Sequence, residues 1–321
     1  MPDRGSPTVR GRRLAAELRR LRERTGLTGE EVAERLGWSG SKVSRIELHR
    51  TGVKQDDLRH LLDLYGVEEP YREDLIALAR ESAQKSPLRQ ITSGFPPEAE
   101  YGTYLSAEAE AESVWNWEPQ VVPGLLQTPD YARAALEPWQ MMFPGPPSEI
   151  ERRVEARLLR QQVLTRDPPL ELSVVIDESV LRRRFGSREV MREQLERLVE
   201  ASELPNVQVR IFRLDGDDAP LSAGAFSYMQ FPHVHDVPFH DIVSVEHLQG
   251  SYYLEDEDQT FRYRVAFEYL VRRALDPAES RSFISATTRE AWSGDQASRQ
   301  LAEMASRRSS CHRETSATPH R

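Results

Sequence analysis

The sequence predicts two domains of different class, an all-α head of five short helices and a larger α+β domain with a mixed sheet. Its length of 321 residues suits two domains at roughly 100–200 residues each. Apolar residues follow a helical period up to about residue 82, whereas strand-like runs begin only after Asp167-Pro168-Pro169. Ser-Pro, Ser-Gly and Pro-Pro pairs interrupt both patterns between 83 and 100. We therefore expect domains at 1–82 and 101–291, a linker at 83–100 and a disordered tail at 292–321.

The five helices of the head are predicted from an apolar face on each and from capping residues at their ends. They are expected at about Val9–Thr25, from Thr28 to Gly37, from Ser39 through Ile46, near Gln55–Tyr65 and after Pro70. Thr28 and Glu31 have the spacing of a capping box, and Ser39 is expected to cap the third helix.

The larger domain is predicted to contain one β-α-β unit followed by antiparallel strands, which makes its sheet mixed. Its strands are expected at Leu172–Ile176, Val207–Phe212, Ala225–Phe231 and Asp241–Leu248. Its helices are expected near Leu105–Trp117, from Thr128-Pro129, from Ser148 to about Thr165, at Ser187–Glu203, near Thr260–Leu275 and at Pro277–Ala291. Ser148 and Glu151 have the spacing of another capping box.

Composition excludes several classes of protein. The single cysteine, Cys311, cannot form an internal disulfide, so the chain is not adapted to an oxidising compartment. No apolar run approaches the roughly 18–20 residues of a membrane helix. The polar, Arg-rich start at Met1–Arg13 is unlike a secretory signal. We expect a cytoplasmic protein with no membrane partner.

Charge is distributed unevenly along the chain. Residues 1–65 contain 14 Lys and Arg against 10 Asp and Glu, and the rest of the chain contains 29 against 42, for a net charge of −9. A basic head on an acidic body favours contact of the head alone with a polyanion. The alternative is a surface helix that happens to be rich in arginine.

Two helices of the head have the arrangement of a helix-turn-helix pair. They are joined by Gly37-Trp38-Ser39, and Ala33, Val43 and Ile46 occupy the positions at which such helices pack. The outer face of the second helix then carries Ser41, Lys42, Ser44 and Arg45. A recognition helix enters the major groove of DNA with its N-terminal residues first, so these side chains are candidates for base and phosphate contacts.

Each of these side chains suits a particular contact with DNA. Arg45 can present two donors to guanine, Ser41 and Ser44 can reach bases or phosphates, and Lys42 suits a phosphate. Ser39 and the free amides at the helix start also favour a phosphate. The complete set of expected DNA contacts is Thr28, Ser39, Ser41, Lys42, Ser44, Arg45 and Arg50.

The head resembles the Xre/Cro-type helix-turn-helix regulators along Leu18–Gly37 and Ser41–Glu47. The resemblance implies a lambda-repressor-like fold and DNA binding. The head departs from the family pattern at Gly29, where a phosphate-contacting Gln is usual, and at Leu48-His49, where a polar residue and Gly are usual. The alternative is a helical bundle that keeps this shape without binding DNA.

The larger domain resembles the C-terminal domain of the WhiJ-like or antitoxin-like regulators of actinobacteria over about residues 100–290. The matching segments are Trp115–Arg133, Val175–Arg182, Gln194–Leu198 and Val243–Glu246. The resemblance implies control of development or secondary metabolism and pairing with a small protein encoded nearby.

Aromatic residues are the main candidates for ligand or partner binding in the larger domain. Trp115, Trp117 and Trp139 with Tyr131 are placed to line a pocket or groove, and packing in the core is the alternative for them. Glu178 follows a predicted strand at a helix start, where we expect an N-terminal cap in preference to a catalytic base.

Histidines in one segment invite a metal-dependent alternative. His233, His235 and His240 lie close together, but Pro232 and Pro238 indicate a loop, and no zinc-binding spacing supports them. The sequence contains no nucleophile elbow, phosphate loop or dinucleotide fingerprint. We therefore expect no metal, no cofactor and no enzymatic activity, with a metal-dependent enzyme carrying a DNA-binding head as a less favoured alternative.

The sequence as a whole predicts a sequence-specific transcriptional regulator, cytoplasmic and associated with the nucleoid when it is bound to double-stranded DNA. One small head makes few contacts, so we expect a homodimer on a pseudo-palindrome with half-sites roughly 34 Å apart. The C-terminal domain is expected to sense a small-molecule effector or a partner protein. The alternative function is an antitoxin-like protein that binds a small partner protein and autoregulates.

Overall fold

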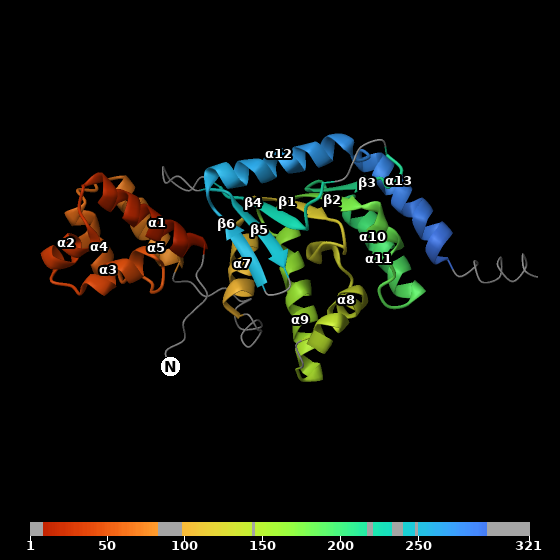
Figure 1. Cartoon of the computed structure of the whole chain (residues 1–321), viewed down its shortest axis with the longest axis horizontal. Coiled ribbons are helices and arrows are strands. Elements are labelled where there is room, and N and C mark those ends of the chain that lie inside the picture. The colour runs from red at the N-terminus through yellow and green to blue at the C-terminus, as the bar shows by residue number, and fades with distance from the viewer. Residues whose placement is uncertain are drawn as a thin grey trace, which may run out of the picture.

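The computed structural model describes residues 9–82, 98–142, 145–216, 221–232, 240–247 and 250–293. The head is all-helical and the larger domain is built on a six-stranded mixed sheet, as the sequence predicts (Figure 1). None of the helices in these ranges is both long and apolar enough to span a bilayer.

All five predicted helices of the head form. They are α1 (Val9–Arg24), α2 (Gly29–Leu36), α3 (Gly40–Glu47), α4 (Gln55–Leu64) and α5 (Tyr71–Ser82). Their apolar faces meet in one core, in which Leu18, Leu58 and Leu75 are almost fully buried. The predicted capping box is present, because Thr28 and Glu31 bond to each other's backbone amides.

The sheet of the larger domain has a parallel half and an antiparallel half. Its strands are β1 (Ser113–Glu118), β2 (Glu171–Asp177), β3 (Val207–Phe212), β4 (Phe226–Gln230), β5 (Ile242–His247) and β6 (Gly250–Leu254). In the strand order β3-β2-β1-β4-β5-β6, the first three strands are parallel and each later strand pairs antiparallel with its neighbour. The four predicted strands all form.

Helices cover both faces of this sheet. They are α7 (Glu98–Glu110), α8 (Pro129–Met142), α9 (Pro147–Arg160), α10 (Glu178–Arg182), α11 (Arg188–Ala201), α12 (Glu257–Arg273) and α13 (Pro277–Thr287). The predicted β-α-β unit is confirmed as β2, α11 and β3, with β2 and β3 parallel. One face packs against α12, and the opposite face packs against α7, α11 and α13 (Figure 1).

The helix predicted near Leu105–Trp117 is wrong over its second half. The helix α7 ends at Glu110, and Ser113–Glu118 is the strand β1, paired with β2 on one side and β4 on the other. Because a central strand can be buried on both faces, β1 does not alternate between apolar and polar residues. The short strand β6 was also not predicted. The linker prediction overlaps α7 at 98–100, whereas 83–97 and 294–321 lie outside the described residues.

Three predicted caps differ from the structure. Ser148 and Glu151 form no capping box, because α9 begins at Pro147, and Glu151 instead accepts from Nε of Arg133 at 2.7 Å. Asp177, not Glu178, caps α10 by accepting from the backbone amide of Ser179. Ser39 occupies the N-cap position of α3 without a side-chain capping bond.

Candidate nucleic-acid interface

The turn between α2 and α3 depends on a glycine. Gly37 ends α2 with a φ of +65°, the left-handed region that glycine adopts without steric cost. The next amide, that of Trp38, donates to the carbonyl of Ala33 at 2.7 Å. These two residues reverse the chain within one short turn and thereby set the angle at which α3 leaves α2.

The helix α3 buries one face and exposes the other. Val43 and Ile46 are 1% and 4% exposed in the head core. Ser41, Ser44 and Arg45 lie on the opposite, exposed face. Because the buried residues fix the rotation of the helix, the three polar side chains form an outward-facing surface at its N-terminal and middle turns.

Arg45 is the longest side chain of this surface. Its Nε donates to the backbone carbonyl of Ser41 at 3.1 Å, which lays the side chain along the helix toward the N-terminus. The hydroxyls of Ser39 and Ser41 lie 3.3 Å apart at the same end of the helix. The arrangement brings hydrogen-bonding groups together at the end that enters a groove first.

Lys42 is held against the head. Its Nζ lies 2.7 Å from Oδ1 of Asp57 on α4 and 3.7 Å from the centre of the Trp38 ring. The side chain is 31% exposed, so it remains accessible to a phosphate, which would have to compete with Asp57. The lysine also links α3 to α4.

An ion pair that the sequence reasoning missed fixes the far end of α3. Arg22 of α1 donates to both carboxylate oxygens of Glu47, at 2.7 and 3.1 Å, and to the carbonyl of Leu27 at 2.8 Å. Hydrogen bonding to Glu47 raises the pKa of Arg22. The two charged residues are 25 positions apart, so no local pattern in the sequence could have found them.

The turn after α3 has unusual backbone geometry at His49, one of the two residues at which the head departs from the Xre/Cro pattern. His49 adopts a φ of +47°, in the left-handed region, at the position where glycine is usual. The amide of Arg50 then donates to the carbonyl of Arg45 at 2.8 Å, and the Arg50 side chain is exposed. Thr28, another expected contact, is exposed but its hydroxyl bonds to Glu31.

The candidate residues of the larger domain do not form one site. Trp117 and Tyr131 are 1% and 0% exposed and belong to cores on opposite faces of the sheet. Glu178 is 5% exposed and accepts hydrogen bonds from Nε of Arg182 at 3.0 Å and from the backbone amide of Leu214 at 3.2 Å. Its carboxylate therefore links α10 to the segment after β3. The Trp139 side chain lies outside the described residues.

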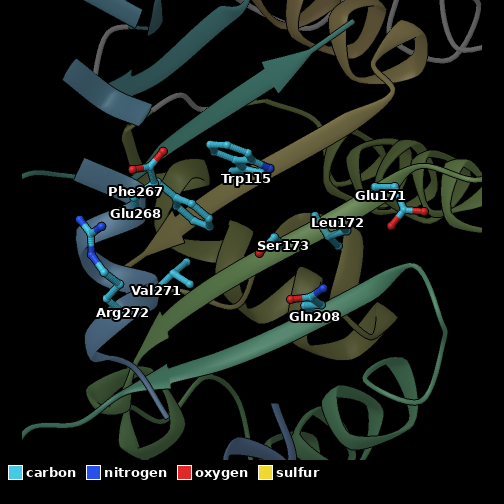
Figure 2. Close-up of a pocket in the computed structure, with 9 residues that line it drawn as sticks. All are labelled: Trp115, Glu171, Leu172, Ser173, Gln208, Phe267, Glu268, Val271 and Arg272. Atoms are coloured by element: carbon cyan, nitrogen blue, oxygen red, sulfur yellow. The ribbon is translucent and has the colours of Figure 1, made fainter. Parts of the chain in front are cut away.

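Trp115 does line an open groove. The groove has a volume of about 440 Å³ and runs between α12 and the part of the sheet that α12 leaves uncovered (Figure 2). Phe267 and Val271 of α12 contribute apolar surface, and Ser173 and Gln208 of the neighbouring strands contribute polar groups. Trp115 stacks on Tyr228 and Phe267 with ring centres 5.1 and 5.4 Å apart.

The histidine cluster is only partly visible. His233 and His235 lie outside the described residues, and His240 is exposed. Within the described ranges, no three His, Cys, Asp or Glu side chains gather closely enough to hold a metal ion.

The head contacts the larger domain through the N-terminal half of α1. Arg12 pairs with Glu255 at 2.9 Å and donates to the hydroxyl of Thr103 at 3.0 Å. Nε of Arg10 lies 3.4 Å from Oε2 of Glu110. These contacts involve the opposite end of α1 from Arg22, and the polar face of α3 remains exposed.

Two family models match the chain. The model described as "Helix-turn-helix domain" matches residues 13–75, and the model described as "Domain of unknown function (DUF5753)" matches residues 101–286. No curated protein is detectably similar to the chain. The first match and the geometry of α2 and α3 indicate a DNA-binding head. The second match spans more than half of the chain, which therefore belongs to the DUF5753 family and carries a helix-turn-helix domain in front of it.

Proposed function

We propose that the protein is a sequence-specific transcriptional regulator of the Xre type, with α3 as the recognition helix. The observation that carries this proposal is the exposed surface of Ser41, Ser44 and Arg45 on a helix whose other face is anchored in the head core. Arg45 contacts a guanine, the two serines contact bases or phosphates, and Thr28, Ser39, Lys42 and Arg50 contact the backbone. The head favours a regulator over an enzyme.

The regulator acts as a homodimer on a pseudo-palindromic operator, because one small head buries too little DNA surface for tight binding. Two apolar side chains one turn apart on α12, Phe261 and Val265, are 51% and 42% exposed and support an apolar contact between copies. Half-sites roughly 34 Å apart would place both recognition helices on one side of the duplex.

The larger domain regulates DNA binding in the cytoplasm by sensing a small-molecule effector or a partner protein. The direct contacts of Arg12 with Thr103 and Glu255 support this role, because they join the head to the start of the larger domain and to the segment after β6. A ligand that prefers one arrangement of these contacts changes the affinity for the operator.

The proposal is tested by selecting duplexes from a random pool with the purified full chain. We expect an enriched pseudo-palindrome, bound with a strong dependence on salt, and a dimer in light scattering of the complex. Failure to enrich any sequence at low salt would contradict the proposal. A monomer with and without the operator would contradict only the dimer.

The groove beside Trp115 favours a second candidate function. It is open, about 440 Å³ in volume, and has the mixed apolar and polar lining that suits side chains of a small protein. In this candidate, the chain is an antitoxin-like protein of the WhiJ-like type that binds a partner encoded nearby and represses its own gene. Co-purification of one small protein with the wild-type chain, and its loss with Val271→Asp, would favour this candidate.

A further inference from the structure

A second cavity lies on the face of the sheet opposite to α12. It has a volume of about 100 Å³ and is bounded by α7, α9 and the four adjacent strands β1, β4, β5 and β6. Asn116 of β1, Ser227 of β4 and Ser244 of β5 occupy directly paired positions across those strands, so their side chains point to the same face. All three are at least 93% buried. Elsewhere on this face the sheet carries an apolar core.

The cavity occupies a special position in the topology. The strand β1 ends at Glu118, where the parallel half of the sheet meets the antiparallel half. The chain leaves the sheet after β1, beside β4, which runs in the opposite direction, and a crevice lies next to this exit. The loop residues Val121, Val122 and Gly124, which follow β1, form one wall of this crevice.

Several polar groups in the cavity lack partners. The hydroxyl of Ser244 bonds to no residue that the structure describes, although the side chain is 4% exposed. Glu118 accepts only a long hydrogen bond of 3.5 Å from the amide nitrogen of Asn116, and Glu246 pairs with none of the described residues. Of these three residues only Ser244 is buried, whereas Glu118 is half-buried and the Glu246 side chain is exposed. A buried hydroxyl normally has a partner, so the three groups together suit a bound ligand.

The charges around the cavity favour a cation. Arg160 is neutralised by Glu108 through two bonds of 2.7 Å, and Arg157 donates to the side-chain carbonyl of Gln127 at 2.7 Å. Glu118 and the exposed Glu246 form no ion pair among the described residues, although the charge of Arg157 acts on Glu118 from the same cavity wall. When the carboxyl groups of Glu118 and Glu246 are both ionised, a positive charge between them relieves their mutual repulsion.

We propose that this cavity binds a small protonated amine that also carries hydroxyl groups. The ammonium group lies between Glu118 and Glu246, and the hydroxyl groups bond to Ser244 and the side-chain carbonyl of Asn116. A volume of 100 Å³ admits a ligand of on the order of seven to ten non-hydrogen atoms, at 10–15 Å³ for each water-sized unit. The proposal names the ligand class for the sensing role proposed above, on which it rests.

The walls of the cavity also reach the head. Tyr104 of α7 lines the cavity, and the preceding residue, Thr103, accepts the hydrogen bond from Arg12. Ser251 of β6 lines it too, and Arg12 lies 5.6 Å from the ring of Tyr253 on the same strand. A bound amine is therefore one residue from the contacts that hold the head, and its occupancy alters the affinity for DNA.

The test compares 3-amino-1,2-propanediol with glycerol, two compounds of the same size that differ in one charged group. Calorimetric titration of the full chain should detect binding of 3-amino-1,2-propanediol. Glycerol should bind at least tenfold more weakly. Glu118→Gln should weaken binding of the amine at least tenfold and Ser244→Ala severalfold. Glu137→Gln, which removes an exposed carboxyl group outside the cavity, should leave binding unchanged. Circular dichroism checks that each variant is folded.

Proton release gives a signature that a merely structural role would not produce. Withdrawal from water and repulsion from Glu246 raise the pKa of Glu118 to about 8, whereas hydrogen bonding to Asn116 and the charge of Arg157 oppose this rise. Other groups facing the carboxyl group are Tyr104 and the Arg160–Glu108 pair. At pH 7 the amine should therefore displace a proton, so the measured heat should differ between phosphate and HEPES buffers, and Glu118→Gln should abolish the difference.

Three results would overturn the proposal: equal binding of glycerol, undiminished binding by Glu118→Gln, or binding of Mg²⁺ but not of the amine. Unchanged affinity for the selected operator in saturating amine would overturn its regulatory part. Arg45→Ala separates this proposal from the DNA-binding one, because that variant should lose operator selectivity and retain amine binding.

Discussion

Nζ of Lys42 lies 2.7 Å from Oδ1 of Asp57, so α3 carries a lysine whose charge is already neutralised within the head. The ammonium group also lies over the ring of Trp38, which is part of the turn between α2 and α3. The lysine thus positions α3 as well as presenting a charge. Its contribution to DNA binding is therefore set by competition between Asp57 and a phosphate.

Removing the competing carboxylate should strengthen DNA binding. Asp57→Asn is expected to raise affinity for every duplex severalfold and to steepen the dependence on salt by up to about one unit of slope, because one more phosphate is neutralised. Lys42→Ala should have the opposite effect on both quantities. The measurement is fluorescence anisotropy with selected and random duplexes at several salt concentrations. Equal binding by Asp57→Asn and the wild type would mean that Lys42 does not meet a phosphate.

Arg45 should determine sequence preference. Arg45→Ala is expected to cost roughly 1–3 kcal/mol on the selected operator and much less on random DNA, because it removes a bidentate contact to one base. Arg35→Ala is the matched control, since Arg35 is an exposed arginine on α2 outside the expected contacts. Repeating the duplex selection with each variant measures the preference at every position. Equal losses on operator and random DNA would assign Arg45 to the backbone.

Gly29 offers a gain-of-function test at the start of α2. A Cβ at this position would lie 3.8 Å from Val43, which is an ordinary contact distance, so a larger side chain can be accommodated. Gly29→Gln should supply the phosphate contact usual in the Xre/Cro pattern and raise affinity for all duplexes severalfold. The stability of the head should change little, because Gly29 is the first residue of α2 and the cost of glycine applies to helix interiors. Gly29→Ala is the control, which should keep the affinity of the wild type.

His49 should carry backbone strain in the turn after α3. Its φ of +47° disfavours residues with a side chain, whereas its neighbour Leu48 has an ordinary φ of −90°. His49→Gly is therefore expected to keep or raise the midpoint of thermal unfolding. Leu48→Gly should lower the free energy of unfolding by roughly 0.5–1 kcal/mol. Scanning calorimetry of both variants makes the comparison, and an equal loss at both positions would argue against strain at His49.

The head could be predicted from sequence because its determinants are local. Thr28 and Glu31 are three residues apart, Gly37 follows its helix directly, and the leucines of each helix repeat at helical spacing. Each feature acts within one or two turns and leaves a short pattern. The contacts that orient α3, from Arg22 to Glu47 and from Lys42 to Asp57, join separate helices and leave no such pattern.

The larger domain was harder to predict because its central strand is buried on both faces. Trp115 and Trp117 point to one face of β1 and Asn116 to the other, yet none of them is well exposed. The cavity that we propose to bind an amine could not be predicted from the sequence for a related reason. Asn116, Ser227 and Ser244 come from three strands spread over more than 120 residues, and only the strand order brings them together.

The raised pKa of Glu118 should make the stability of the larger domain depend on pH. Because the pKa rises from 4.5 to about 8 on folding, the native state favours the protonated carboxyl group. The stability that the protonated carboxyl group gives to the native state is complete below pH 4.5 and is lost as the pH rises through 8. One pKa unit is worth about 1.4 kcal/mol, so the loss is at most about 5 kcal/mol. Glu118→Gln cannot ionise, so its free energy of unfolding relative to the wild type should increase from pH 5 to pH 9. Chemical denaturation at pH 5, 7 and 9 measures this difference, and a constant difference would mean that water reaches Glu118 freely and that its pKa is ordinary.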